Sequence, residues 1–339
     1  MLNKSKSKGT HVYRGHTAPV TALALSHYTA VAPLLLYTSS WDKTILCFDA
    51  YTRSLLRKFT NGHSDFIKCL LFLPPRSPTN HSPGLLLSGS SDSTITIWNP
   101  LTTEKLSSLP GHIRGVLSLA LDPTPPESSQ TPYVVLSGGS EREIRTWCIP
   151  AEGTSAHEDV EKPPLISHAT SVYKLRFSTP DDLWTASADT TAQRINIRHP
   201  ERPSDEILQH PDFVNDVIVA GGVGEGDGEG MWVVTACRDE NVRLWNRATG
   251  KLVHIFDGHF DEVTSLTTVG PGGWVVVSVS IDGTVRRWGV RPDEVQIAIE
   301  EAKKRGDRWE EQEDEELRKE SALTEEEERE LADLMEDSD

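Results

Sequence analysis

The feature that most constrains this chain is a pattern that recurs six times along it. In each repeat a histidine precedes two β-rich runs, the second run leads into an acidic residue, and a large apolar residue stands six positions later. The six histidines are His16, His63, His112, His168, His210 and His259. The acids, each with the large apolar residue six positions later, are Asp42 with Phe48, Asp92 with Trp98, Glu141 with Trp147, Asp189 with Ile195, Asp239 with Trp245, and Asp282 with Trp288. Successive histidines lie 42 to 56 residues apart. This period predicts a repeat architecture in which each unit packs against its neighbours.

Over about residues 10–290 the pattern resembles the WD-repeat family of β-propellers. The resemblance implies an all-β fold in which each blade has four strands, a to d. The histidine would precede strand a, the acid would lie in the tight b–c turn, and the tryptophan in strand c. With a Ser or Thr of strand b they would form a buried network, because a buried indole N–H and a buried carboxylate each need partners. We interpret the six sets as structural, since a catalytic site occurs once and not in every repeat.

The six repeats match this pattern unevenly. Residues 85–99, LLLSGSSDSTITIWN, and residues 232–246, WVVTACRDENVRLWN, match it most fully. Phe48 and Ile195 stand at the tryptophan position of blades one and four and carry no N–H donor. We therefore expect an incomplete network in blade four, which should be the weakest or most altered blade.

The blade count is six from the sequence, with seven, the commonest number in the family, as the alternative. The last repeat ends at Trp288 without a fourth strand, and residues 10–14 could supply one. Such pairing of the two chain ends would close the ring and remove an exposed strand edge.

Charge separates a body from a tail. The formal net charge is −17, and residues 291–339 hold 21 acidic and 8 basic residues, so the tail alone carries −13. We predict a flexible basic segment at 1–9, a propeller at 10–290 and an acidic helical tail at 291–339. One helix should begin at Pro292, and a second, with a capping box of Thr324 and Glu327, should extend from Thr324 to Met335. The tail could pack on the propeller, dock on a partner or remain solvated.

Four polar, Pro- and Gly-rich insertions, at 74–84, 122–132, 150–164 and 220–230, interrupt the repeats and are predicted as loops. By resemblance to the family they lie on the face with the a–b and c–d loops. The opposite, top face carries the d–a connections and the b–c turns, and stays compact. Aromatic and Arg residues on a rigid surface are typical of binding hot spots. We therefore predict a partner-binding top face that comprises Trp41, Phe66, Arg114, Phe213, Arg238, Phe260 and Ile281.

No nucleotide-binding loop, zinc motif, nucleophile elbow or paired cysteine spacing is present in the sequence. We expect a non-enzymatic scaffold that binds proteins or peptides as a subunit of a multiprotein complex, with no cofactor or metal. The sequence lacks the roughly 20 apolar residues of a membrane span, and no secretory signal is expected, so cytoplasm and nucleus stay open. The acidic charge disfavours nucleic acid.

The alternatives are a ubiquitin-ligase substrate receptor, which Trp245-Asn246-Arg247 fits poorly, and a WD-repeat hydrolase.

Overall fold

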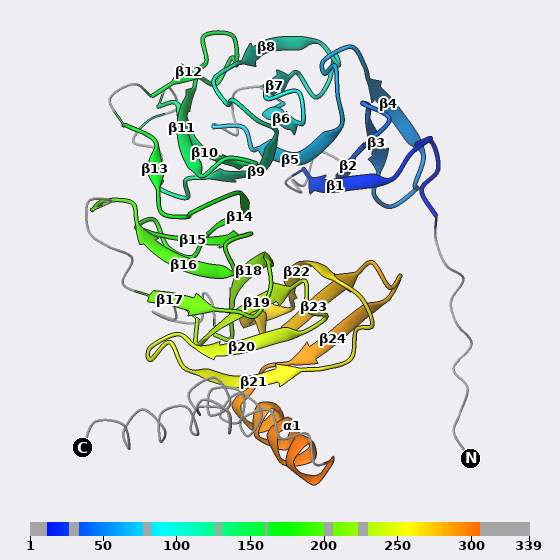
Figure 1. Cartoon of the computed structure of the whole chain (residues 1–339). Coiled ribbons are helices and arrows are strands. Elements are labelled where there is room, and N and C mark those ends of the chain that lie inside the picture. Colours follow the sequence, from blue (N-terminus) through cyan, green and yellow to red (C-terminus); the bar gives the residue numbers. More distant parts are fainter. Residues whose placement is uncertain are drawn as a thin grey trace, which may run out of the picture. The chain divides into compact units, whose positions relative to one another are not determined.

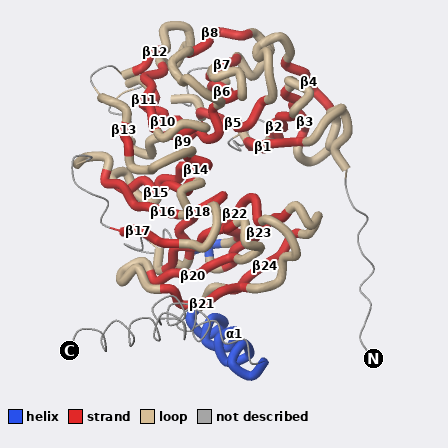
Figure 2. Tube along the Cα trace, viewed as in Figure 1, coloured by secondary structure: helices blue, strands red, loops and turns tan. Residues whose placement is uncertain are grey.

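The computed structural model describes residues 12–26, 34–76, 83–125, 128, 131–159, 162–199, 206–222 and 230–305. The chain divides into two compact units, Met1–Trp288 and Gly289–Asp339. The first unit is built of strands and the second contains a helix (Figures 1 and 2).

The first unit is a six-bladed propeller, as the repeat count predicts. Its blades are antiparallel sheets that follow one another along the chain. Blade one comprises β1 (Val20–Leu25), β2 (Leu35–Ser40), β3 (Ile45–Asp49) and β4 (Leu55–Phe59); blade two comprises β5 (Ile67–Leu73), β6 (Leu85–Ser90), β7 (Ile95–Trp98) and β8 (Lys105–Leu109). Blade three comprises β9 (Val116–Leu121), β10 (Tyr133–Gly139), β11 (Glu143–Ile149), β12 (His157–Glu158) and β13 (Leu165–Ile166); blade four comprises β14 (Val172–Phe177), β15 (Asp182–Ser187), β16 (Thr191–Asn196) and β17 (Glu206–Gln209). Blade five comprises β18 (Val214–Ala220), β19 (Trp232–Cys237), β20 (Val242–Asn246) and β21 (Leu252–Phe256); blade six comprises β22 (Val263–Val269), β23 (Val275–Ser280) and β24 (Val285–Gly289).

The repeated acid fixes the turn between the second and third strands of most blades. In five blades the residue after the acid adopts a left-handed backbone, with φ between 67° and 77°. These residues are Lys43, Ser93, Thr190, Glu240 and Gly283. In blade two the Asp92 carboxylate accepts hydrogen bonds from the backbone N–H and the hydroxyl of Thr94, which holds the turn closed. The acid therefore supports a conformation that few side chains favour.

The hydrophobic core lies between consecutive blades. The first strands of neighbouring blades contact one another in the order β1, β5, β9, β14, β18 and β22. Between blades one and two, Tyr37 and Phe59 pack with Trp98, and the rings of Phe59 and Trp98 meet edge to face with centroids 5.6 Å apart. Each of the first five blades thus packs against the blade that follows it in the chain.

Two local expectations from the sequence are not met. Residues 150–164, predicted as a loop, contain β12, which pairs with β11 through Trp147 and Glu158. Residues 12–14 form no strand; instead the hydroxyl of Tyr13 donates to the carbonyl of Ala50 at 2.9 Å. The Tyr13 ring packs edge to face on Phe48 of blade one, which explains why this segment is held there. Thr10 and His11 lie outside the described residues.

The second unit contains one described helix, α1 (Pro292–Arg305), at the position that the sequence predicts. Pro292 suits the first helical position because its missing N–H would have no partner there. Asp293 and Glu294 stand in the first turn, where negative charge favours the helix dipole. The predicted helix from Thr324 to Met335 lies outside the described residues.

Candidate functional site

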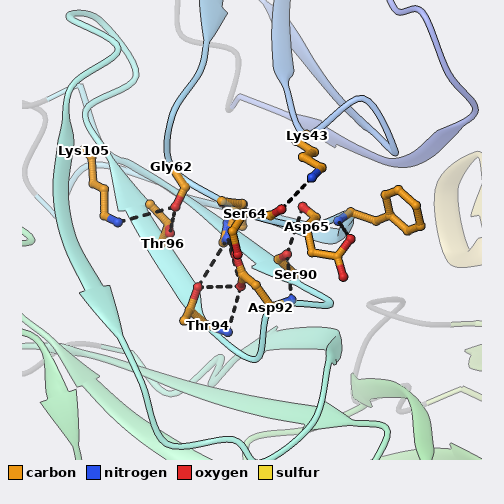
Figure 3. A network of polar contacts seen from close by, with 12 residues as sticks. Lys43, Gly62, Ser64, Asp65, Ser90, Asp92, Thr94, Thr96 and Lys105 are labelled. Carbon is orange, nitrogen blue, oxygen red and sulfur yellow. Dashed lines mark hydrogen bonds and ion pairs between the residues drawn. The ribbon is translucent and has the colours of Figure 1, made fainter.

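Blade two has the full polar network expected beneath the top face, and Figure 3 shows the part of it around Asp92, Thr94 and Ser64. The indole N–H of Trp98 donates to Ser88 Oγ at 2.8 Å, and Ser88 Oγ lies 2.7 Å from His63 Nε2. His63 Nδ1 lies 3.0 Å from the Asp92 carboxylate, which also accepts from the backbone N–H of Ser64 at 2.9 Å. Burial lowers the pKa of His63, so the imidazole is neutral, donating from Nδ1 and accepting at Nε2.

Four other blades repeat the contact between histidine and acid. The ring Nδ1 of each histidine approaches the acid in the pairs His16–Asp42, His112–Glu141, His168–Asp189 and His259–Asp282. Trp147 and Trp288 donate to Ser137 and Ser278 as Trp98 does in blade two. In blade four Ile195 supplies no donor, yet His168 still contacts Thr185 Oγ1 at 2.7 Å. The blade-four network therefore lacks only its indole.

Blade five departs from the expected network although its sequence fits the pattern well. His210 Nδ1 donates to the Leu208 carbonyl at 3.0 Å, while Nε2 lies 2.8 Å from Thr235 Oγ1. Asp239 is held by Arg243, whose guanidinium nitrogens lie 3.0 and 2.5 Å from its two carboxylate oxygens. The indole of Trp245 still donates to Thr235. The histidine and acid of this blade thus belong to separate hydrogen-bond groups.

The sequence explains this exchange of partners. In the other five blades, the residue after the histidine donates its backbone N–H to the acid. In blade five that residue is Pro211, which has no N–H. The position two residues after the acid carries Asn241, where blades one, two, four and six carry a threonine whose hydroxyl donates to the acid. Arg243 replaces these lost donors with a charged, bidentate one.

The networks set the protonation states of their members. Burial alone would raise the pKa of Asp42, but hydrogen bonds from Thr44, Thr17 and His16 lower it to about 2. Burial, together with the Arg243 charge, lowers the pKa of His210 to about 3. Asp42 is therefore ionised and His210 neutral at physiological pH, as a structural network requires.

Backbone hydrogen bonds tie together the two parts of each repeat that form the top face. In every blade, the backbone N–H of the residue before the acid donates to the backbone carbonyl of the residue three positions after the histidine. The donor–acceptor pairs are Trp41–Pro19, Ser91–Phe66, Ser140–Gly115, Ala188–Ser171, Arg238–Phe213 and Ile281–Glu262. Trp41, Arg238 and Ile281 therefore stand at the donor position of this hydrogen bond, and Phe66 and Phe213 stand at the acceptor position. Arg114 and Phe260 precede the acceptor position by one and two residues.

The structure brings two groups of these residues together. Trp41 of blade one stacks on Phe66 of blade two, with centroids 5.1 Å apart and planes 17° apart. The Lys68 ammonium lies 4.9 Å from the Trp41 ring centroid. Trp41 and Phe66 stay 41% and 38% exposed, so part of each side chain is open to solvent. The sequence pattern did not identify Lys68, because it lies within β5 and not at a turn.

The second group joins blades four and five. Arg238 lies over the Phe213 ring, 5.3 Å from its centroid, and Tyr173 meets that ring edge to face at 6.3 Å. Phe260 is far more exposed than Phe213 and has Arg286 over its ring. Among the described residues, Arg114 makes no cation–π contact with either aromatic group. Tyr173, like Lys68, is a neighbour that spacing within one repeat does not reveal.

Across residues 12–305 with the gaps given above, no three His, Cys, Asp or Glu side chains converge as metal ligands would. None of the helices that the structure describes is long and apolar enough to cross a membrane.

Comparison with known proteins places these repeats in a family. The model of the WD domain, G-beta repeat, matches residues 7–49, 53–99 and 250–289. An uncharacterised WD repeat-containing protein of Schizosaccharomyces pombe is 32% identical over 289 residues, which are 83% of this chain and 70% of that protein. The p21-activated protein kinase-interacting protein 1-like of Xenopus laevis is 28% identical over 86% of this chain and 70% of its own length, and human striatin-3 is 23% identical over 71% of this chain and 36% of its own. The chain belongs to the WD-repeat family of β-propellers.

Proposed function

We propose that this chain is a non-catalytic interaction scaffold, a subunit of a multiprotein complex that holds a protein segment on its top face. The observation that carries the proposal is the stacked pair of Trp41 and Phe66. Two large aromatic rings from different blades are ordered by each other and by Lys68, and both remain partly exposed. Ordered aromatic side chains lose little entropy on binding, which is why they serve as hot spots.

The chemistry of the top face favours a particular kind of segment. Lys68, Arg238 and Arg286 each lie over an aromatic ring, so apolar surface and positive charge alternate there. A peptide with apolar side chains next to acidic ones would match both features. A nucleic acid is a weaker match, because the whole chain carries a net charge of −17.

The recurrent histidines support a structural rather than a catalytic role. Their Nδ1 atoms are occupied by acids in five blades and by a carbonyl in blade five. Five of the six sets share one geometry, and in blade five the acid is held by Arg243 instead of the histidine. No set therefore stands out as a coupled pair that the other blades lack, as a catalytic group would. A WD-repeat hydrolase would need one histidine whose replacement abolishes turnover while its equivalents do not.

The names of similar proteins agree with a binding role. One relative is named for its interaction with p21-activated protein kinase, and we propose that this chain likewise binds a protein partner, of unknown identity. A ubiquitin-ligase substrate receptor remains the alternative. Docking through residues 324–335, and residence in cytoplasm or nucleus, remain proposals from the sequence.

A matched pair of variants tests the top face. Trp41 lies in the turn before β3 and Tyr51 lies in the turn after it, so the two exposed aromatic residues stand at opposite ends of one strand. Complexes would be isolated from host cells with the wild-type chain, Trp41→Ala and Tyr51→Ala. We expect Trp41→Ala alone to lose stoichiometric partners, with affinity weakened by about 2 kcal/mol.

Thermal unfolding of the same variants separates binding from folding. Trp41→Ala should leave the unfolding temperature nearly unchanged, because the side chain is already partly exposed. A large drop would show that Trp41 is a core residue. Unchanged partners with unchanged stability, or equal losses with Tyr51→Ala, would reject the top face as the binding site.

A further inference from the structure

The first blade has an apolar face that the other blades keep covered. In blades two to six, the residue of the innermost strand that lies opposite the network hydroxyl of the next strand is buried or half-buried. In blade one the residue at this position is Leu23, opposite Thr38. Leu23 is 64% exposed, whereas its equivalent in blade four, Leu175, is 2% exposed. Val20 and Leu25 on the same strand are exposed as well.

The sixth blade has a matching exposed face. Val285 follows its turn acid by three residues, as Ile95 does in blade two, yet Val285 is 67% exposed and Ile95 is buried. Val269 pairs with Val275 as Leu73 pairs with Leu85 in blade two, and Val269 is exposed where Leu73 is fully buried. Blades one and six stand at the two ends of the blade series (Figure 1), and each carries exposed aliphatic side chains.

An open strand edge accompanies these faces. In blades one to five the strand that follows the turn acid pairs with a further strand on its outer side. Within the described residues β24 pairs with β23 alone. An antiparallel edge of this kind presents N–H and C=O groups that another strand can pair with.

The rest of this chain is poorly suited to cover the exposed faces. Residues 1–11, MLNKSKSKGTH, contain two large apolar residues and three lysines. Residues 306–339 contain no valine or isoleucine and 17 acidic residues, a composition that disfavours a strand. Tyr13 is already held on Phe48 and Ala50 of blade one.

We propose that a partner protein inserts antiparallel β-strands at the seam defined by Val20, Leu23 and Leu25 of blade one and by Val269, Val285 and the edge of β24 of blade six. One inserted strand pairs with β24, and aliphatic side chains on the insert cover the valines and leucines. Exposed Arg287 on β24 favours an acidic side chain opposite it. This seam shares no residue with the proposed top-face site, so either proposal can fail alone.

Photocrosslinking of the full chain in its host cells tests the proposal. The crosslinking residue p-benzoylphenylalanine replaces Leu23 or Val285, and Ile113, an exposed residue on the top side of blade three, provides the control. We expect Leu23 and Val285 to label neighbouring segments of one other protein, and Ile113 not to label them. A peptide copying the labelled segment should bind the purified chain and slow amide exchange in β24. Leu23→Asp and Val285→Asp should weaken that binding at least tenfold while leaving the unfolding temperature nearly unchanged.

Each other result overturns the proposal. Crosslinks from Leu23 to blade six or to residues 1–11 would mean that the chain closes its own ring. Crosslinks to a second copy, with a dimer in light scattering, would make the seam a self-interface. Absence of crosslinks from both positions would mean that the seam has no occupant. Unfolding of the two aspartate variants would show that the chain buries these side chains itself.

Discussion

Blades two and five carry nearly the same sequence signature but different networks. In blade two His63 contacts the Asp92 carboxylate, which also accepts hydrogen bonds from the Ser64 backbone N–H and the Thr94 hydroxyl. In blade five Pro211 and Asn241 remove those two donors, and Arg243 takes the carboxylate instead. The comparison teaches that the acid in the turn of a blade needs hydrogen-bond donors, and that the histidine is only one residue that can supply them.

The largest expected effect follows from removing the arginine on which blade five depends. Arg243→Ala would leave the largely buried Asp239 carboxylate without its arginine partner. It should lower the free energy of unfolding by about 3 kcal/mol. Thr96 occupies the same position in blade two and donates only to the Gly62 carbonyl at 3.3 Å. Thr96→Ala should therefore cost about 1 kcal/mol in the same urea titration. Equal costs would mean that Asp239 regains His210, and the distinction between the two blades would vanish.

The network hydroxyl offers a second test, between blades two and four. Ser88 accepts from Trp98 and contacts His63, so Ser88→Ala leaves two buried groups without partners. We expect a cost of about 2 kcal/mol in urea unfolding. The Thr185 hydroxyl forms a hydrogen bond with His168 but accepts none from an indole, because Ile195 stands at the tryptophan position. Thr185→Val should cost about 1 kcal/mol, and a loss as large as that of Ser88→Ala would contradict the weaker network inferred for blade four.

Acid titration separates the histidines of blades two and five. Because His210 has a folded pKa of about 3, the unfolded chain binds its proton first as the pH falls. Stability from this residue is therefore lost below about pH 6.5, at about 1.4 kcal/mol per pH unit. In unfolding measured from pH 7 to 5, His210→Gln should flatten the decline. His63→Gln should flatten it less, because Asp92 favours protonation of His63. The opposite order would reject the separate networks.

The sequence predicted the fold well because the signal repeats. Six histidines and six acids at regular spacing define six blades, and Pro292 marks the helix that follows them. The pairing of Asp239 with Arg243 was missed, since the pattern records which residue types recur and not which donors compete. Pro211 was the available signal. The partners of Trp41 and Phe213 were also missed, because Lys68 and Tyr173 contact them as three-dimensional neighbours that no spacing within a single repeat can indicate.

The smallest expected effect is also the most direct comparison of the two blades. A double-mutant cycle of His63→Ala and Asp92→Ala should show a coupling energy of about 1 kcal/mol, because each residue is the other's hydrogen-bond partner. The cycle of His210→Ala and Asp239→Ala should show less than about 0.5 kcal/mol, since these two side chains bind different groups. Each histidine variant alone should still cost stability, His210→Ala because it leaves Thr235 and the Leu208 carbonyl without their ring partner. Coupling in blade five as strong as in blade two would show that Arg243 does not displace the histidine.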